Sequence, residues 1–140
     1  MNDTQPVQGL LIAHGTFSQG MLDAVRRITG IDDAVTPISN SGLGPDALAQ
    51  VIRDQLGDGP AILFTDLPSG SCGMTAHRLL RDRPGLHVVS GVNLPLLLEF
   101  AMSRDLPVNE LIPRLLQKGR AGIGCTPEEP AHADRTAARG

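Results

Sequence analysis

The stretch VQGLLIAHG, residues 7–15, is a short apolar run that ends in His14 and Gly15. A continuous apolar run of this length, followed by glycine and a helical pattern, is typical of a buried parallel strand that leads into a helix. Ligands of open α/β sheets bind at the carboxyl ends of the strands. His14 is therefore predicted at the edge where chemistry is done, and histidine is a nucleophile that titrates near neutral pH. The alternative is a ring that only bonds a backbone carbonyl at the strand end.

Strand-like and helix-like segments alternate along the rest of the chain. Short apolar runs predict further strands, and apolar residues at helical spacing predict helices; the strands cover residues 34–38, 61–65 and 86–92, and the helices 17–28, 46–56, 71–81, 95–102 and 108–117. Ser18 is interpreted as the N-cap of the first helix and Gly30 as its stop. Pro37 cannot donate to a ladder, which favours a sheet edge for its strand.

This alternation predicts an α/β fold. We expect a doubly wound, mainly parallel four-stranded sheet with helices on both faces, joined by right-handed crossovers. Residues 121–124 are predicted to add a short C-terminal strand. The length of the chain fits one such domain, which we expect over residues 1–125. Residues 126–140, rich in Ala, Arg and Pro, are expected to be a disordered tail or the stub of a linker.

The composition excludes several classes of function. The chain has 140 residues, of which 41% are hydrophobic, enough for a single core and too many for a disordered chain. Three Phe, no Tyr and no Trp argue against nucleic-acid binding through base stacking. A net charge of -3 without a basic stripe argues against a phosphate-backbone partner. We therefore expect no nucleic-acid partner.

Nothing in the sequence indicates export or membrane insertion. Residues 1–6 are polar and lack the features of a signal peptide. The longest other apolar stretch, residues 92–102, is interrupted by polar residues and proline. Cys72 and Cys125 form no CxxC or zinc pattern, so we expect free thiols in a reducing compartment and a cytoplasmic protein.

Three predicted strands end in polar residues at one edge of the sheet. The first ends at His14, the third at Asp66 and the fourth within residues 90–93. If the first and third strands are neighbours, Asp66 meets His14. A carboxylate bonded to one ring nitrogen sets the tautomer and stabilises the positive charge that develops when the other nitrogen attacks an electrophile. The alternative role for Asp66 is a cap on the loop that follows it.

A loop rich in Ser and Gly follows Asp66 and precedes a predicted helix. Backbone N–H groups at a helix start, together with hydroxyls, form a cradle for phosphate oxygens. A Ser-Gly-Ser tripeptide alone is common in plain turns, so its place after Asp66 is what carries the prediction. The residues predicted to bind phosphate are Thr65, Ser69, Gly70 and Ser71. With His14 and Asp66 as catalytic residues, the set describes a histidine that accepts a phosphoryl group.

Three blocks of the chain carry a resemblance to a known family. The blocks LLIAHGTFSQGMLDAV, LFTDLPSGS and VVSGVNLPLLLEF resemble the mannose-type (mannose/fructose/sorbose family) IIA component of the phosphoenolpyruvate-dependent sugar phosphotransferase system, over residues 7–124. The resemblance implies that His14 accepts a phosphoryl group from the histidine phosphocarrier protein and passes it to a IIB protein or domain. It implies that Asp66 supports the histidine and that Ser71 lies near the phosphoryl group.

The same resemblance implies an assembly. It indicates a homodimer in which a C-terminal strand is exchanged, with residues 121–124 as its short counterpart here, and a membrane contact only indirectly, through a permease complex. No cofactor and no metal are expected at His14. Whether the carrier serves sugar uptake or only regulation is left open, and a subunit that phosphorylates a dihydroxyacetone kinase is a related possibility.

One departure from the family pattern follows Ser71. The family continues this loop with Ser-Pro, whereas this chain has Cys72 and Gly73, and Gly weakens a helix start by up to roughly 1 kcal/mol relative to Ala. The change bears on partner choice and loop rigidity. Cys72 is interpreted as a buried or half-buried thiol.

Two alternatives come from other classes. A tetrapyrrole metal chelatase also begins with a strand that ends in His-Gly, and it needs a second ligand across a cleft. His77 and His87 are the internal candidates, and neither follows a strand at its carboxyl end; we assign no catalytic role to them or to His132. A non-catalytic regulatory sensor with the same fold is the other alternative, although His14 and Asp66 are both present.

Overall fold

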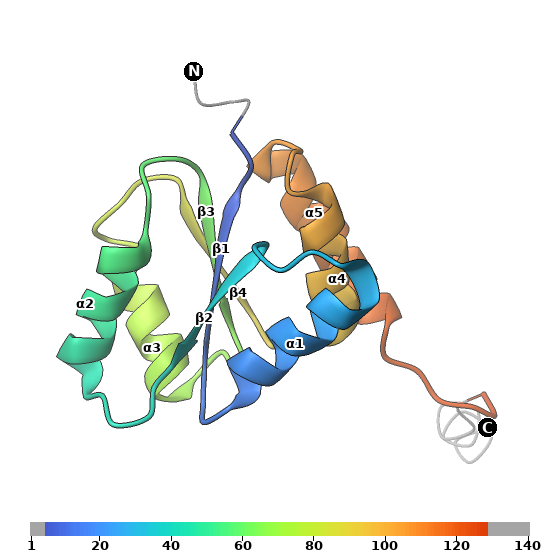
Figure 1. Cartoon of the computed structure of the whole chain (residues 1–140), viewed down its shortest axis with the longest axis horizontal. Helices are drawn as coiled ribbons and strands as arrows, with labels where there is room; N and C mark the ends of the chain where they lie inside the picture. Colours follow the sequence, from blue (N-terminus) through green and yellow to red (C-terminus); the bar gives the residue numbers. More distant parts are fainter. Residues whose placement is uncertain (1–4, 129–140) are drawn as a thin grey trace, which may run out of the picture.

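The structure, a computed structural model, describes residues 5–128 (Figure 1). The predicted tail over residues 126–140 lies largely outside the described residues, and His132 lies wholly outside them. The described part forms strands and helices that alternate up to α4: β1 (Gln8–Ala13), α1 (Phe17–Thr29), β2 (Val35–Ser39), α2 (Pro45–Gln55), β3 (Ala61–Thr65), α3 (Gly70–Leu79), β4 (Leu86–Ser90), α4 (Leu94–Ser103) and α5 (Val108–Ala121).

The four strands form one parallel sheet in the order β2-β1-β3-β4. Helices α1, α4 and α5 cover one face of this sheet, and α2 and α3 cover the other (Figure 1). The predicted doubly wound fold is therefore confirmed. Pro37 lies on β2 at the edge of the sheet, where its missing N–H breaks no ladder to a further strand.

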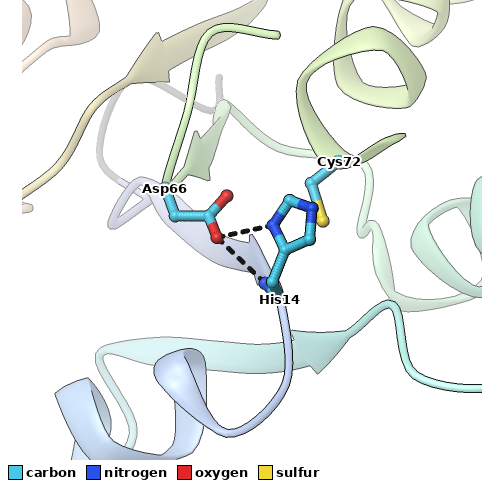
Figure 2. A group of neighbouring side chains, drawn as sticks. All are labelled: His14, Asp66 and Cys72. Atoms are coloured by element: carbon cyan, nitrogen blue, oxygen red, sulfur yellow. Dashed lines mark hydrogen bonds and ion pairs between the residues drawn. The ribbon is translucent and has the colours of Figure 1, made fainter. Parts of the chain in front are cut away.

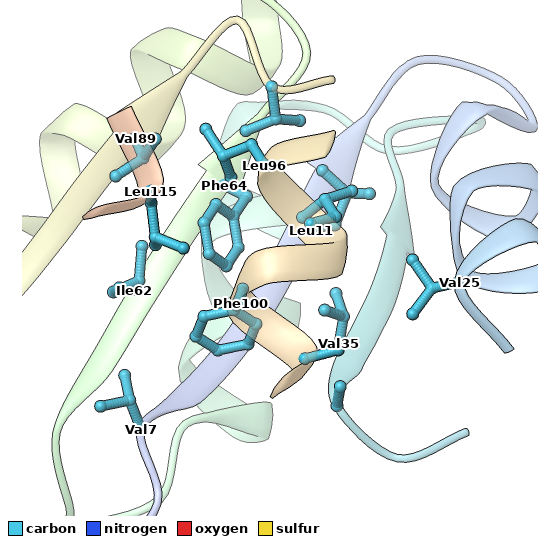
Figure 3. Close-up of a cluster of buried hydrophobic side chains, with 14 of the residues drawn as sticks. Val7, Leu11, Val25, Val35, Ile62, Phe64, Val89, Leu96, Phe100 and Leu115 are labelled. Atoms are coloured by element: carbon cyan, nitrogen blue, oxygen red, sulfur yellow. The ribbon is translucent and has the colours of Figure 1, made fainter. Parts of the chain in front are cut away.

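Each face of the sheet has its own apolar core. Successive side chains of a strand point to opposite faces, so Leu11 packs under α4 while Leu10 and Ile12 pack under α2 and α3. Burial on both faces explains why β1 and β3 are continuous apolar runs rather than alternating ones. Figure 3 shows the larger core, in which the rings of Phe64 and Phe100 meet edge to face with centroids 4.9 Å apart.

Gly9 on β1 allows α4 to approach the sheet closely. A Cβ atom at this position would lie 2.6 Å from Cε2 of Phe100 and 3.1 Å from Cε2 of Phe64. The absence of a side chain at residue 9 is thus a packing requirement of the larger core, and not a break in the strand.

The first helix differs from the prediction at its start and agrees at its end. Ser18 is not the N-cap: α1 begins at Phe17, and the buried Ser18 hydroxyl donates to the Ile38 carbonyl, 3.4 Å away on β2. Packing of α1 against β2 therefore overrides the capping preference of serine. Gly30 ends the helix as predicted, with φ 80° and its N–H 2.7 Å from the Arg26 carbonyl.

The predicted strand over residues 121–124 is wrong for the single chain. Helix α5 continues to Ala121, and the Gly122 N–H still donates to the Lys118 carbonyl at 3.0 Å. No strand follows within residues 122–128, because a strand needs a neighbouring edge and this segment pairs with none in its own chain. Within residues 5–128, no helix combines the length and apolarity needed to cross a membrane.

Candidate functional site

Strand order brings His14 and Asp66 together at the carboxyl edge of the sheet. β1 and β3 are paired neighbours, with Ile12 opposite Thr65, so the residues that follow the two strands emerge side by side. The backbone N–H of His14 donates to Asp66 Oδ2 at 2.9 Å, and ring atom Nδ1 lies 2.8 Å from the same oxygen (Figure 2). The predicted meeting of the two side chains is confirmed.

Asp66 has both of the roles considered for it. Its Oδ2 holds His14, and its Oδ1 accepts from the Leu67 N–H at 2.9 Å, which shapes the start of the loop. Partial burial raises the pKa of Asp66, but the hydrogen bonds from the His14 N–H, the His14 ring and the Leu67 N–H outweigh it and hold that pKa below its ordinary value. Asp66 is therefore a carboxylate, and a carboxylate only accepts hydrogen bonds.

The tautomer of His14 follows from this contact. Since Asp66 Oδ2 is an acceptor, Nδ1 carries the proton, and the lone pair of a neutral ring is on Nε2. The His14 side chain is 44% exposed, against 11% for Asp66. The structure thus exposes nearly half of the His14 side chain to solvent while the carboxylate bonded to it is largely covered.

The start of α3 faces the His14 ring. A Cβ atom on Gly70 would lie 3.6 Å from Cε1 and 3.7 Å from Nε2 of His14, and Gly70 has φ +78°, a conformation that favours glycine. Ser69, Gly70 and Ser71 are all exposed, and the first turn of α3 has no acidic residue. Free N–H groups of a helix start beside the ring nitrogen favour an anion there.

Thr65 lies apart from the other residues that were predicted to bind phosphate. It is 0% exposed, its hydroxyl donates to the Leu67 carbonyl at 2.8 Å, and it lies 2.9 Å from the Ser90 hydroxyl. The buried Thr65 hydroxyl, which contacts both Leu67 and Ser90, therefore supports the loop after β3 and connects it to β4. Ser69, Gly70 and Ser71 of the same loop are exposed instead.

Asn40 is a site residue that the sequence analysis missed. Its backbone N–H donates to the Ala13 carbonyl at 3.1 Å, and its side-chain Nδ2 donates to Ser71 Oγ at 3.0 Å. Because Ser71 Oγ accepts from Asn40, its own proton is free for a third group. The signal was present, since the polar loop after β2 begins at Asn40, but only the position of β2 beside β1 brings this loop to His14.

Gly73 has a structural reason that also explains the departure from the family pattern. A Cβ atom at this position would lie 2.5 Å from the Pro68 carbonyl oxygen and 2.8 Å from the Leu67 carbonyl oxygen. The loop after Asp66 thus folds back onto the first turn of α3, and glycine permits that contact. The expected loosening of the helix start is offset by closer packing of the loop.

Cys72 lies close to the pair of His14 and Asp66. The thiol is fully buried, as predicted. Burial raises its pKa, the charge of Asp66 raises it further, and a contact with the Ser71 hydroxyl acts in the opposite direction. One nitrogen of His14, one oxygen of Asp66 and the sulfur of Cys72 all lie within 4.8 Å of one another (Figure 2). These are the residues that could hold a metal ion at this site.

The other described histidines lie elsewhere. His77 is exposed on α3, where Nδ1 lies 2.7 Å from the Gly73 carbonyl, and His87 is near the amino end of β4, with Nδ1 3.1 Å from the Gly85 carbonyl. Neither joins His14, which the chelatase interpretation would require. Each of these rings therefore contacts a backbone carbonyl of its own segment.

The geometry describes an α/β protein with an oriented histidine at the ligand-binding edge of a parallel sheet, and comparison with known proteins identifies its family. The family profile described as the fructose IIA component of the PTS, the phosphotransferase system, matches residues 9–115. The chain belongs to this family, EIIA-man. Its role is therefore phosphotransfer within the phosphotransferase system. Comparison with curated proteins found no match.

Solved structures with the same fold carry related descriptions. The EIIA component from Streptococcus agalactiae superposes with a TM-score of 0.80 at 24% identity, covering 85% of this chain and 96% of that one. The mannose/sorbose specific IIA subunit from Enterococcus faecalis has a TM-score of 0.78 at 25% identity, covering 89% of this chain and 98% of that one. These two similarities extend over 85% and 89% of this chain and over 96% and 98% of the two relatives.

Proposed function

We propose that this chain is a phosphoryl carrier in which Nε2 of His14 accepts a phosphoryl group from the histidine phosphocarrier protein and passes it to a IIB protein or domain. The observation that carries the proposal is the contact between Asp66 Oδ2 and Nδ1 of His14 at 2.8 Å, which leaves Nε2 with the free lone pair on a side chain that is 44% exposed. Family membership supports the same class of reaction.

The transfer step uses the two residues in distinct roles. The Nε2 lone pair attacks the phosphorus of the donor's phosphohistidine, and the bond from phosphorus to the donor's ring nitrogen breaks as the new bond forms. The proton on Nδ1 stays there, hydrogen-bonded to Asp66, and the carboxylate balances the positive charge of the phosphorylated ring. Positioning and electrostatic stabilisation supply most of the catalysis in such transfers.

The start of α3 receives the phosphoryl oxygens in this proposal. Gly70 lies beside Nε2 and lets the backbone approach the ring, and Ser71 can turn its hydroxyl proton toward a phosphoryl oxygen because Asn40 donates to its oxygen. Ser69 contributes the exposed N-cap position of the same helix. Thr65 acts indirectly, through the buried hydrogen bond that holds the Leu67 carbonyl.

Intact-mass spectrometry at mildly alkaline pH tests the proposal. The protein is incubated with phosphoenolpyruvate, enzyme I and the histidine phosphocarrier protein, beside the variants His14→Ala and His77→Gln. We expect one acid-labile phosphoryl group on the wild type and on His77→Gln, an exposed histidine outside the site. His14→Ala is expected to stay folded and unmodified, and its full phosphorylation would refute the assignment.

We further propose a cytoplasmic homodimer that reaches the membrane only through a permease complex. The unpaired edge of β4 and the 77% exposed Ile123 support a contact between two chains, in which residues 121–124 of one chain pair with the sheet of the other. Size-exclusion chromatography with light scattering measures this directly. Replacing Ile123 by Lys is expected to give a monomer that is still phosphorylated, whereas an unchanged dimer would place the interface elsewhere.

A further inference from the structure

Residue 72 gives this site a ligand that phosphotransfer does not use. Cys72 is fully buried, and its sulfur lies within 4.8 Å of one nitrogen of His14 and one oxygen of Asp66. Nitrogen, carboxylate oxygen and sulfur converge from the ends of β1 and β3 and the first turn of α3 (Figure 2). Three such ligands with an open side are the donor set of an exchangeable zinc site.

We propose that His14, Asp66 and Cys72 bind a borderline-soft divalent cation of the Zn²⁺ type, and that this binding competes with phosphorylation of His14. The second half of the proposal rests on the proposed function, whereas the first half stands on the three ligands alone. The cation is an inhibitor of the carrier here, and it takes no part in the transfer.

The distances suit such a cation after small side-chain movements. With bonds of about 2.0–2.3 Å in a tetrahedral arrangement, ligand atoms are spaced about 3.3–3.6 Å apart. Nδ1 of His14 and Oδ2 of Asp66 are 2.8 Å apart, and no two ligand atoms of His14, Asp66 and Cys72 are more than 4.8 Å apart. To bind the cation, the His14 nitrogen and the Asp66 oxygen therefore move slightly apart, and the Cys72 side chain rotates to bring its sulfur closer to them. The exposed His14 ring provides the open side through which the cation reaches the buried sulfur.

The donor set selects the class of cation. Thiolate and imidazole favour Zn²⁺ and related transition metals, whereas Mg²⁺ and Ca²⁺ favour oxygen ligands. On binding, bonds form from the cation to nitrogen, oxygen and sulfur, water leaves the cation, and the thiol proton passes to the buffer. Where Nδ1 is the nitrogen that binds, its proton moves to Nε2, so that the ring stays neutral. No oxidation or reduction takes place.

Competition with phosphorylation follows from the chemistry of one ring. A neutral imidazole has a single lone pair. If the cation takes that lone pair, at either nitrogen, none remains to attack phosphorus. Phosphorylation of the ring excludes the cation for the same reason, so each modification blocks the other.

Cobalt binding tests the site without any phosphotransfer. The reference protein is Cys125→Ser, which removes the exposed thiol, and Cys72→Ser is introduced into it as the matched variant. Titration with Co²⁺ under a phosphine reductant is followed by thiolate-to-cobalt charge-transfer absorption in the near ultraviolet. We expect a one-equivalent signal in the reference protein, its loss in the Cys72→Ser and His14→Ala variants, and its displacement by Zn²⁺. Absence of the signal in the reference protein, or its persistence without Cys72, would overturn the proposal.

Zinc inhibition tests the competition. Each protein is phosphorylated by the same donor mixture with increasing Zn²⁺, and its rate without Zn²⁺ is its own reference. The Zn²⁺ concentration that halves the rate is expected to rise at least about tenfold in Cys72→Ser. Loss of a group that supports a metal site weakens metal binding by at least about this factor. Equal sensitivity of the two proteins would overturn the competition. A protein that binds Co²⁺ through Cys72 but accepts no phosphoryl group would instead contradict the proposed function alone.

Discussion

Asp66 presents one carboxylate oxygen to both the backbone and the ring of His14. This arrangement couples the end of β1 to the orientation of the imidazole, because the N–H at 2.9 Å and Nδ1 at 2.8 Å share the same acceptor. The pair is placed by two strand ends rather than by flexible loop residues, which favours a preorganised nucleophile. Substitution of single residues therefore tests the chemistry of this site.

Asp66→Asn is expected to slow phosphorylation and to leave the protein folded. The asparagine carbonyl still accepts from Nδ1 but has no charge to balance the phosphorylated ring. We expect the phosphorylation rate to fall at least about tenfold, equivalent to about 1.4 kcal/mol of transition-state stabilisation. A time course of intact mass gives the rate, and circular dichroism checks the fold. An unchanged rate would mean that the charge of Asp66 has no part in the transfer.

Asn40→Asp is expected to impair phosphorylation more than Asn40→Ala. Asparagine donates to Ser71 Oγ, whereas an aspartate only accepts and draws the Ser71 proton toward itself. Alanine leaves that hydroxyl free. We expect a loss of about tenfold for Asn40→Asp, or about 1.4 kcal/mol, and a smaller one for Asn40→Ala, both measured as initial phosphorylation rates.

A Ser71→Ala background separates orientation from simple charge repulsion. If Asn40→Asp acts through the Ser71 hydroxyl, adding it to Ser71→Ala has little further effect on the rate. Two fully additive losses would show that the charge of the new aspartate acts on the site directly, without the Ser71 hydroxyl.

At the scale of elements, the loop after β3 and the first turns of α3 form one packed unit. Thr65 holds the Leu67 carbonyl, and Gly73 admits the backbone of Leu67 and Pro68 against the helix. The helix start beside His14 is thereby held by contacts on both of its sides. Ion pairs between α2 and the α3 region, Arg78 with Asp46 and Arg53 with Asp82, lie on the surface and add little to this.

Gly73→Ala is expected to destabilise the protein, and Gly20→Ala to stabilise it. Both glycines lie inside helices, but a Cβ at Gly73 would meet the Pro68 carbonyl oxygen at 2.5 Å, while a Cβ at Gly20 meets nothing within 4 Å. Replacing an exposed helical glycine by alanine stabilises by about 0.5–1 kcal/mol. Overpacking at residue 73 is expected to cost about 1–3 kcal/mol. Urea unfolding of the two variants measures both, and stabilisation by Gly73→Ala would contradict the packing argument.

At the scale of the whole molecule, the carboxylates determine how the folded state responds to acid. The pKa of Asp66 is lowered by the bonds from His14 and Leu67, which exceed the effect of burial. Hydrogen bonds from Arg27 and Arg26 lower that of Asp23, and those from Ser103 and Arg114 help to lower that of Glu99. In each case the unfolded chain binds protons more readily than the folded chain as the pH falls.

The contribution of these carboxylates to the free energy of unfolding is therefore expected to be constant near neutral pH and to fall below about pH 5. The contribution of Asp66 is complete above its unfolded pKa and is lost as the pH drops through its lowered folded pKa. Urea midpoints measured between pH 7 and pH 3 are expected to decline less steeply for Asp66→Asn than for the wild type. Asp58→Asn removes one carboxylate without removing a His14 contact and controls for net charge. An identical decline in all three proteins would contradict the linkage.

Much of this architecture was accessible from local patterning. Short apolar runs on β1 and β3 and helical periodicity between them predicted the doubly wound sheet, because burial on both faces demands continuous apolar strands. Pro37 predicted the edge position of β2, and Gly30 the end of α1. The meeting of His14 and Asp66 followed from the rule that parallel strands end at the same edge.

Other features required the folded chain. Four features depend on residues far apart in sequence or on the direction of one side chain. They are the burial of Thr65, the contact of Asn40 with Ser71, the packing of Ser18 against β2, and the approach of Cys72 to His14 and Asp66. Local sequence encodes periodicity, turns and caps, which depend on near neighbours. Which strand lies beside which, and how closely a loop packs on a helix, depends on the shape of the whole core, and that shape exists only once the segments have assembled.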